Sequence, residues 1–128
     1  MIVSGDSVAR FVSDRLGVSF CPPFTCMGIA RDGEVVAGVL FNQFEGPNIH
    51  VTAAGSGWSR AFIREVGRYV FLRLRCGRMT FTTEQQAVAD YAVRLGGQVE
   101  GRMRDYYGEG RDGILVGVLR ADWRFPLG

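Results

Sequence analysis

The fold of this chain is decided by residues 48–74, which read NIHVTAAGSGWSRAFIREVGRYVFLRL. Apolar residues alternate at the start of this stretch, with Ile49, Val51 and Ala53 on one face, as in a half-buried strand. Small residues follow, and from Trp58 onward the apolar residues recur at the spacing of a helix. The stretch therefore predicts a strand, a loop without bulky side chains, and a helix.

The loop in this stretch is typical of an anion-binding site. The segment Ala54-Gly55-Ser56-Gly57 has little side chain to obstruct a ligand, and it leads into the first turn of the helix. Free backbone N–H groups and the positive end of the helix dipole face a ligand at such a position. We therefore expect a phosphate-bearing cofactor here. Its expected contacts are Gly55, Ser56, Gly57, Trp58, Ser59 and Arg60, the last through a charge-assisted hydrogen bond.

Length and composition indicate a single globular domain. The chain has 128 residues, a usual domain size, and its 47% of hydrophobic residues are enough for a core. We expect a short N-terminal helix and a Pro-containing connector in residues 1–23, a core in residues 24–123 and a tail in residues 124–128. No segment approaches the roughly 18 to 20 apolar residues of a membrane helix, and the first apolar stretch contains charges, unlike a secretory signal. The expected location is the cytoplasm, without a membrane partner.

The cysteines do not indicate a metal site, and the net charge does not indicate a nucleic-acid partner. Cys21, Cys26 and Cys76 form no C-x-x-C pair, and the single histidine, His50, has no metal-ligand spacing to any of them. We therefore predict no metal and interpret the cysteines as buried, inert thiols. The net charge of +2 is too small to indicate a nucleic-acid partner, although it does not exclude one.

The rest of the chain predicts a mixed α/β (α+β) fold. Asp32-Gly33 between two apolar runs indicates a two-residue hairpin turn. A strand at 78–83 follows a helix, so it should run parallel to the strand at 48–53 through a right-handed crossover. We expect a central sheet of about six strands with helices on both faces. The predicted elements are helix 6–16, strands 24–31, 34–43 and 48–53, helix 58–74, strand 78–83, helix 84–95, and strands 98–107 and 112–119.

This order of elements resembles the GNAT superfamily of N-acetyltransferases. Residues 54–59 take the place of the family's pyrophosphate loop, whose usual pattern is Arg/Gln-x-x-Gly-x-Gly/Ala. Residues 85–96 resemble the family helix Asn-x-x-Ala-x-x-x-Tyr-x-x-x-Gly-Phe, counted back from its glycine. On that register Gln85 stands in the place of Asn, Ala92 in the place of Tyr and Gly97 in the place of Phe.

Two further segments resemble particular branches of this superfamily. Residues 99–104 and 112–123 look like the closing hairpin of the ribosomal-protein-type and small phage-type acetyltransferases. Residues 41–50 and 58–65 look most like the small phage-encoded branch. The resemblance as a whole covers residues 24–123.

The resemblance implies an acyltransferase that moves an acetyl group from acetyl-CoA to an unidentified amine. It implies that the loop holds the diphosphate of coenzyme A. It also implies that backbone groups of Val51, Thr52 and Ala53 hold the pantetheine arm and the thioester carbonyl, where two parallel strands splay apart. The enzyme would work as a monomer or a homodimer.

Acyl transfer to an amine needs a base and an acid, and the sequence offers candidates for both. An imidazole can accept a proton near neutral pH, so His50 is a candidate base, beside Glu45 in the next turn. Both also fit plainer interpretations, His50 as a residue at the core edge and Glu45 as a solvated turn residue.

The candidate acids are Tyr91, Tyr106 and Tyr107. Tyr91 lies one helix position from the family's tyrosine and also fits core packing. On a strand, Tyr106 and Tyr107 would point to opposite faces, so that one of them faces the cleft. The candidate catalytic residues are therefore His50, Glu45 and Tyr107.

Two other functions stay open at this point. The loop departs from the family pattern, so the chain would also fit a GNAT-fold domain, such as one of phage origin, that has lost its chemistry and binds a partner. A weaker alternative is acetyl-CoA-dependent modification of nucleic-acid bases. An open cleft between the parallel strands favours the enzyme, whereas a cleft filled by Trp58 or Phe44 favours the binding protein.

Overall fold

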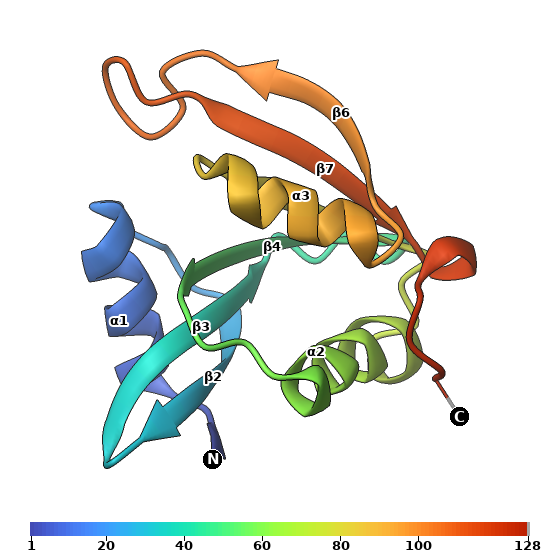
Figure 1. Ribbon diagram of the computed structural model, residues 1–128, viewed down its shortest axis with the longest axis horizontal. Coiled ribbons are helices and arrows are strands. Elements are labelled where there is room, and N and C mark those ends of the chain that lie inside the picture. Colours follow the sequence, from blue (N-terminus) through green and yellow to red (C-terminus); the bar gives the residue numbers. More distant parts are fainter. Residues whose placement is uncertain (128) are drawn as a thin grey trace.

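The computed structural model describes residues 1–127, which form helices around one sheet. The strands are β1 Ile2–Val3, β2 Phe24–Arg31, β3 Glu34–Asn42, β4 Asn48–Gly55, β5 Arg78–Thr83, β6 Gln98–Met103 and β7 Gly113–Leu119. The helices are α1 Asp6–Leu16, α2 Arg60–Gly67 and α3 Gln86–Arg94; a π-helical segment, Arg68–Arg73, continues α2, and a 3-10 turn, Arg120–Asp122, follows β7. The sheet order is β1-β2-β3-β4-β5-β7-β6, and β4 and β5 are its parallel pair (Figure 1).

The predicted order of elements is confirmed, with three differences. The sheet has seven strands because Ile2–Val3 adds a short edge strand against β2. The long helix begins at Arg60 and changes to π-helical geometry at Arg68, where the N–H of Leu74 reaches back to the carbonyl of Tyr69. Strand β6 ends at Met103, so the prediction that Tyr106 and Tyr107 lie on a strand is wrong.

The hairpin and the parallel pair were predicted correctly. Arg31 pairs with Glu34 across the turn, and both turn residues have positive φ, 53° at Asp32 and 81° at Gly33. These angles match a two-residue turn whose twist suits a hairpin. Strand β5 runs parallel to β4 after the helical crossover.

Helices cover both faces of the sheet, as predicted. Helices α2 and α3 cover the face that carries Val51 and Phe81, and they form the larger of two apolar clusters. Helix α1 covers part of the opposite face, where Leu16 lies in a smaller cluster with Leu40 and Tyr107. Figure 1 shows α1 on one side of β2 and β3 and α2 on the other.

Two glycines let α1 approach the sheet closely. Gly28 of β2 and Gly38 of β3 face each other across the strand pair. A Cβ at Gly38 would lie 2.9 Å from side-chain carbons of both Val8 and Val12, and a Cβ at Gly28 would lie 3.0 Å from Val8. Real Cβ atoms do not approach other atoms so closely, so the height of α1 above the sheet depends on both glycines.

The C-terminal segment covers one end of the core with Trp123 and Phe125. The Trp123 ring lies 5.6 Å from the ring of Phe71 and 5.9 Å from that of Phe125. Its indole rests directly on Gly67 of α2, where a side chain would collide with it. The expected tail ends at Gly128, which lies outside the described residues.

The cysteines differ from one another more than the sequence indicated. Cys76 is buried. Cys26 is half-buried, and its burial together with the nearby Asp6 raises the pKa of its thiol to about 11. Cys21 is exposed, so the prediction of three buried thiols is wrong for this residue, which follows α1 in a connector open to solvent. Within residues 1–127, no helix combines the length and apolar character needed to cross a membrane.

Candidate functional site

The parallel strands β4 and β5 stop pairing before β4 ends. They pair from Asn48 and Arg78 as far as Thr52 and Thr82. Beyond this point β4 stays paired with β3 up to Gly55, whereas Thr83 of β5 pairs with β7. Residues 53–55 therefore have a neighbouring strand on one side only.

A cavity of about 170 Å³ lies where the strands diverge, and we call it the splay cavity. Its walls include the backbone of Ala53, Ala54 and Gly55 and the residues that follow β5, Glu84 and Gln85. These β4 residues have small side chains or none, which leaves the backbone accessible. Of the expected binding residues on β4, Val51 packs into the core under α2 and α3, Thr52 faces the opposite side, and Ala53 reaches the cavity.

The loop after β4 offers free amides, as expected, but fewer of them. The N–H of Ser56 donates to the carbonyl of Val36 at 3.1 Å and is thus not available. Ser59 caps α2, and its Oγ accepts from the N–H of Phe62 at 3.1 Å. Within residues 1–127, the N–H groups of residues 57–61 have no acceptor. The free amides of the loop therefore start at Gly57 rather than at Gly55.

Arg31 reaches this loop from the tip of the β2–β3 hairpin, a contact that the sequence analysis missed. Its Nη2 donates to the carbonyl of Gly57 at 3.0 Å, and a Cβ at Gly57 would lie 2.7 Å from its Nη1. Arg60, the expected charged contact, instead lies over the Phe125 ring, 5.4 Å from its centroid. The guanidinium next to the free amides therefore belongs to Arg31 of β2 and not to Arg60 of α2.

Trp58 forms a wall of the splay cavity rather than filling it. The side chain is half-buried, its ring lies 5.7 Å from that of Phe62, and it separates the splay cavity from a smaller apolar cavity of about 70 Å³ under α2 and α3. Phe44 lies elsewhere, at the mouth of a larger pocket, with 56% of its surface exposed. Neither side chain fills the gap between the strands.

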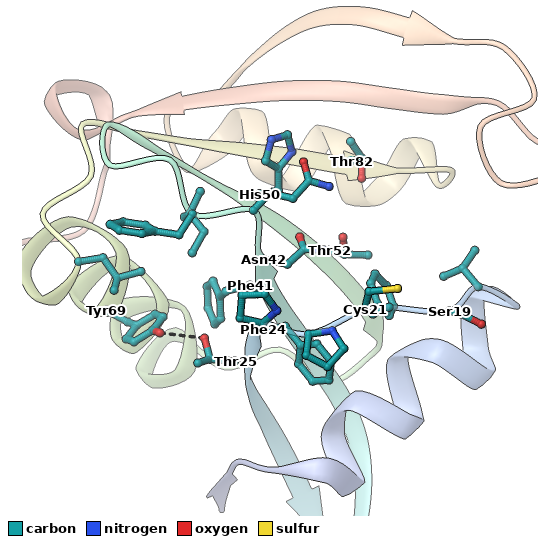
Figure 2. A pocket seen from close by; sticks show the side chains of 18 of the residues that line it. Ser19, Cys21, Phe24, Thr25, Phe41, Asn42, His50, Thr52, Tyr69 and Thr82 are labelled. Atoms are coloured by element: carbon teal, nitrogen blue, oxygen red, sulfur yellow. Dashed lines mark hydrogen bonds between the residues drawn. The ribbon is translucent and has the colours of Figure 1, made fainter.

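This larger pocket, of about 820 Å³, is lined by residues of the sheet face that α1 partly covers and, at one end, by Tyr69 and Leu74 of the helical crossover, and we call it the large pocket. Figure 2 shows His50, Thr52 and Thr82 along one side of it and Phe24 and Phe41 across from them. The connector after α1 closes one end, and Tyr69 closes the other through a 2.8 Å hydrogen bond to Thr25.

The structure brings together the two residues that the sequence offered as alternative bases. Nε2 of His50 lies 3.3 Å from Oε1 of Glu45. The same carboxylate oxygen accepts from Nδ2 of Asn48 at 3.1 Å, so two residues of β4 hold it in place. A proton on Nε2 would face this carboxylate and leave Nδ1 of His50 as an acceptor. This arrangement orients an imidazole that lines the large pocket.

Tyr107 brings its phenol to the point where the strands diverge. It lies in the turns after β6, is buried, and its OH donates to Oγ1 of Thr82 at 3.2 Å. Burial raises the pKa of this phenol above its ordinary value, so it stays protonated at neutral pH. Tyr106 is 52% exposed, and Tyr91 lines the apolar cavity on the other face of the sheet. Tyr107 is thus the candidate acid with the right position.

A clamp of polar contacts holds the Tyr107 turn against the sheet. Arg111 makes two hydrogen bonds to Glu84, of 2.6 and 3.0 Å, and one of 3.2 Å to the carbonyl of Leu16 at the end of α1. No sequence pattern indicates this clamp, because its three members are far apart in the chain. It joins α1, the end of β5 and the β6–β7 turn around the splay cavity.

Comparison with known proteins shows the fold. No protein-family model matches the sequence, and no curated protein matches it in sequence. Among solved structures, the spermidine/spermine N-acetyltransferase SpeG from Vibrio cholerae matches with a TM-score of 0.73 and 11% identity in its complex with manganese ions, over 94% of this chain and 92% of that one. Another form of SpeG matches with a TM-score of 0.72 and 11% identity, over 94% and 95%.

A chimera of SpeG and hSSAT gives a third similarity. It has a TM-score of 0.63 and 13% identity, over 77% of this chain and 68% of that one. The architecture defined by these similarities and by the diverging parallel strands is the GNAT fold of N-acetyltransferases. The chain therefore has the fold that its order of elements led us to expect.

Proposed function

We propose that this protein is an N-acetyltransferase that moves an acetyl group from acetyl-CoA to an amine. The proposal depends above all on the divergence of β4 and β5 after Thr52 and Thr82, which leaves residues 53–55 with a free backbone edge. An extended ligand can add to such an edge as a strand does, and a pantetheine arm has the amide groups to do so. The GNAT fold supports the same activity class.

The residues around the loop fit the diphosphate of coenzyme A. The free N–H groups of residues 57–61 lie at the start of α2, where the helix dipole favours negative charge. Arg31 adds a fixed positive charge beside Gly57. Ala53 and Gly55 would hold the arm, and Trp58 and Ser59 would form the walls of the loop. Arg60 would contribute through charge at longer range.

The large pocket supplies the groups for proton transfer. Acetyl-CoA supplies the acetyl group as a thioester, whose C–S bond breaks as the new C–N bond forms. His50, oriented by Glu45, accepts the proton that the attacking amine loses. Tyr107 donates a proton to the departing sulfur from its position beside Thr82. A backbone N–H at Ala53, the first residue of β4 without a partner on β5, stabilises the charge on the carbonyl oxygen.

Two finer points remain predictions. The splay cavity and its free backbone edge favour an active enzyme over a GNAT-fold domain that only binds a partner. The resemblance to the small phage-encoded and ribosomal-protein-type branches rests on the sequence segments alone.

Calorimetric titration of the whole chain with acetyl-CoA tests the proposal. Arg31→Ala is expected to weaken binding about tenfold or more, because a hydrogen bond between charged groups contributes roughly 1.5–3 kcal/mol. Arg64→Ala is the matched control, since this exposed arginine on α2 carries the same charge but makes no contact with the loop. Absence of binding to the wild-type protein would contradict the proposal.

A second pair of variants isolates charge from backbone geometry. Gly57→Asp and Gly57→Asn place side chains of equal size at a residue with a φ of 83°, which both types tolerate better than most. Asp adds a negative charge where the diphosphate is expected, so it should weaken binding more than Asn does. Equal affinities would show that no anion binds at this loop.

A further inference from the structure

Aromatic side chains form a large part of the walls of the large pocket. Four phenylalanines, Phe20, Phe24, Phe41 and Phe44, line it from the connector after α1, from β2, from β3 and from the β3–β4 turn. Three tyrosines, Tyr69, Tyr106 and Tyr107, line it from the helical crossover and the β6–β7 turns. Rings from so many separate segments surround one space, and such walls bind flat apolar groups by burial and by stacking.

The pocket walls carry no fixed charge. Among residues 1–127, no Asp, Glu or Arg lines this pocket, and the chain contains no lysine. The nearby carboxylate of Glu45 already contacts His50 and Asn48. A ligand with several positive charges would lose hydration there without gaining ion pairs, and a phosphate-bearing ligand would find no cation.

Three of the polar side chains of the pocket lie together on the parallel strands, whereas Ser19, Thr25, Asn42 and Gln43 line other parts of it. His50, Thr52 and Thr82 lie side by side on β4 and β5, where the proposed base and the divergence of the strands are found. Figure 2 shows Phe24 across the pocket from His50 and Thr82. The pocket therefore offers an uncharged place for one reacting nitrogen beside His50 and aromatic rings for the rest of the molecule.

We infer that the acceptor is a small amine with one basic nitrogen on a short chain and an aromatic ring, and not a polyamine or a nucleic acid. This inference rests on the proposed acetyl transfer and specifies its acceptor. The ring lies between the phenylalanines and the exposed rings at the mouth, and the nitrogen lies beside His50. The cavity volume of about 820 Å³ is in the range of pockets for such ligands.

Ligand-observed NMR of the whole chain without acetyl-CoA tests this inference separately from acetyl transfer. The probes are 2-phenylethylamine, butylamine and spermidine at equal concentration. 2-Phenylethylamine should bind about tenfold or more tightly than butylamine, because its ring is removed from water, and spermidine should bind no better than butylamine. Spermidine binding equal to or tighter than that of 2-phenylethylamine would overturn the inference.

The same experiment separates failure of the inference from failure of the proposed function. If acetyl-CoA binds and none of the three amines does, the acceptor class is wrong while the transferase proposal stands. If 2-phenylethylamine binds and acetyl-CoA does not, the pocket takes aromatic amines but the transferase proposal fails.

Phe44 is the best position for variants, because it is 56% exposed and belongs to neither apolar cluster, so folding does not depend on it. Phe44→Ala should weaken 2-phenylethylamine binding about threefold or more, and Phe44→Leu, which keeps an apolar side chain, should weaken it less. Phe44→Glu should reverse the preference by raising spermidine affinity. Unchanged affinity for 2-phenylethylamine in both Phe44→Ala and Tyr106→Ala would overturn the placement of the ring.

Discussion

The two faces of β4 and β5 differ in chemistry although the same strands form both. Ile49, Val51, Met79 and Phe81 lie under α2 and α3, and all four are apolar and buried. The intervening residues His50, Thr52, Thr80 and Thr82 are polar. On this second face, Thr80 bonds Asn48 and Arg78, and Thr82 bonds Tyr107. Alternation along two strands thus places a dry core and a polar site back to back.

The largest expected effect is a difference in stability between variants of two adjacent residues of β5, one on each face of the sheet. Phe81→Ala should lower the free energy of unfolding by about 3–5 kcal/mol, because it opens a cavity in the core. Thr82→Val keeps the shape of the side chain and removes one hydrogen bond, so it should cost about 1 kcal/mol. Chemical denaturation of both variants measures the difference. Equal losses would mean that the two faces do not differ in their contribution to stability.

The next effect concerns activity on the polar face. Tyr107→Phe should reduce kcat for acetyl transfer about 100-fold, which is the lower end of the contribution of a general acid. Steady-state kinetics with acetyl-CoA and the best amine probe measures it, with circular dichroism as a check on folding. Tyr106→Phe is the control, since that ring is exposed and its OH has no partner within residues 1–127. A Tyr107→Phe enzyme with normal kcat would assign the acid to another group.

A smaller effect tests whether Glu45 orients His50 or takes the proton itself. Glu45→Gln removes the charge that orients His50, and an exposed ion pair contributes about 1 kcal/mol or less, so kcat should fall by no more than about fivefold. Glu65→Gln is the matched control on α2, where the carboxylate contacts Arg68 instead. A loss like that of a catalytic base would show that Glu45 itself takes the proton.

The smallest effect is a dependence of stability on pH that comes from the clamp. The hydrogen bond from Arg111 holds the pKa of Glu84 below its ordinary value of about 4.3. The folded state therefore gains stability from this carboxylate above that pH and loses it as the pH falls through the lowered pKa. The melting temperature of Glu84→Gln should be a few degrees or less below wild type at pH 7, and the two should converge near pH 3. A constant difference across this range would exclude the linkage.

Much of the fold could be predicted because short sequence patterns indicate its strands, helices and turns. Alternating apolar residues marked β4 and β5, and Asp32-Gly33 marked the hairpin turn. The end of β6 was misplaced because the glycines of Gly108-Glu109-Gly110 indicated a turn only after Tyr107. In the folded chain, a hydrogen bond from the N–H of Gly110 to Asp105 Oδ1 closes a turn there instead.

The candidate site was only partly predictable, and the reason is distance along the chain. His50, Glu45 and Tyr107 were recognisable one by one as proton-transfer groups, but their relative positions depend on tertiary structure. Arg31 was missed because it reaches Gly57 only after β2, β3 and β4 have paired in register, with Ala37 opposite Gly55. Ser56 was assigned to the ligand because the sequence does not show that Val36 takes its N–H.

Because α1 packs closely against Gly28 and Gly38, these two glycines can affect which substrates the large pocket admits. The connector that bears Phe20 and Cys21 continues directly from this helix, so any side chain at either glycine would raise the helix and carry that rim of the pocket outward. Under the proposed function, a mutation one or two strands away from His50 would thereby admit bulkier amines, while every residue that touches them stayed the same.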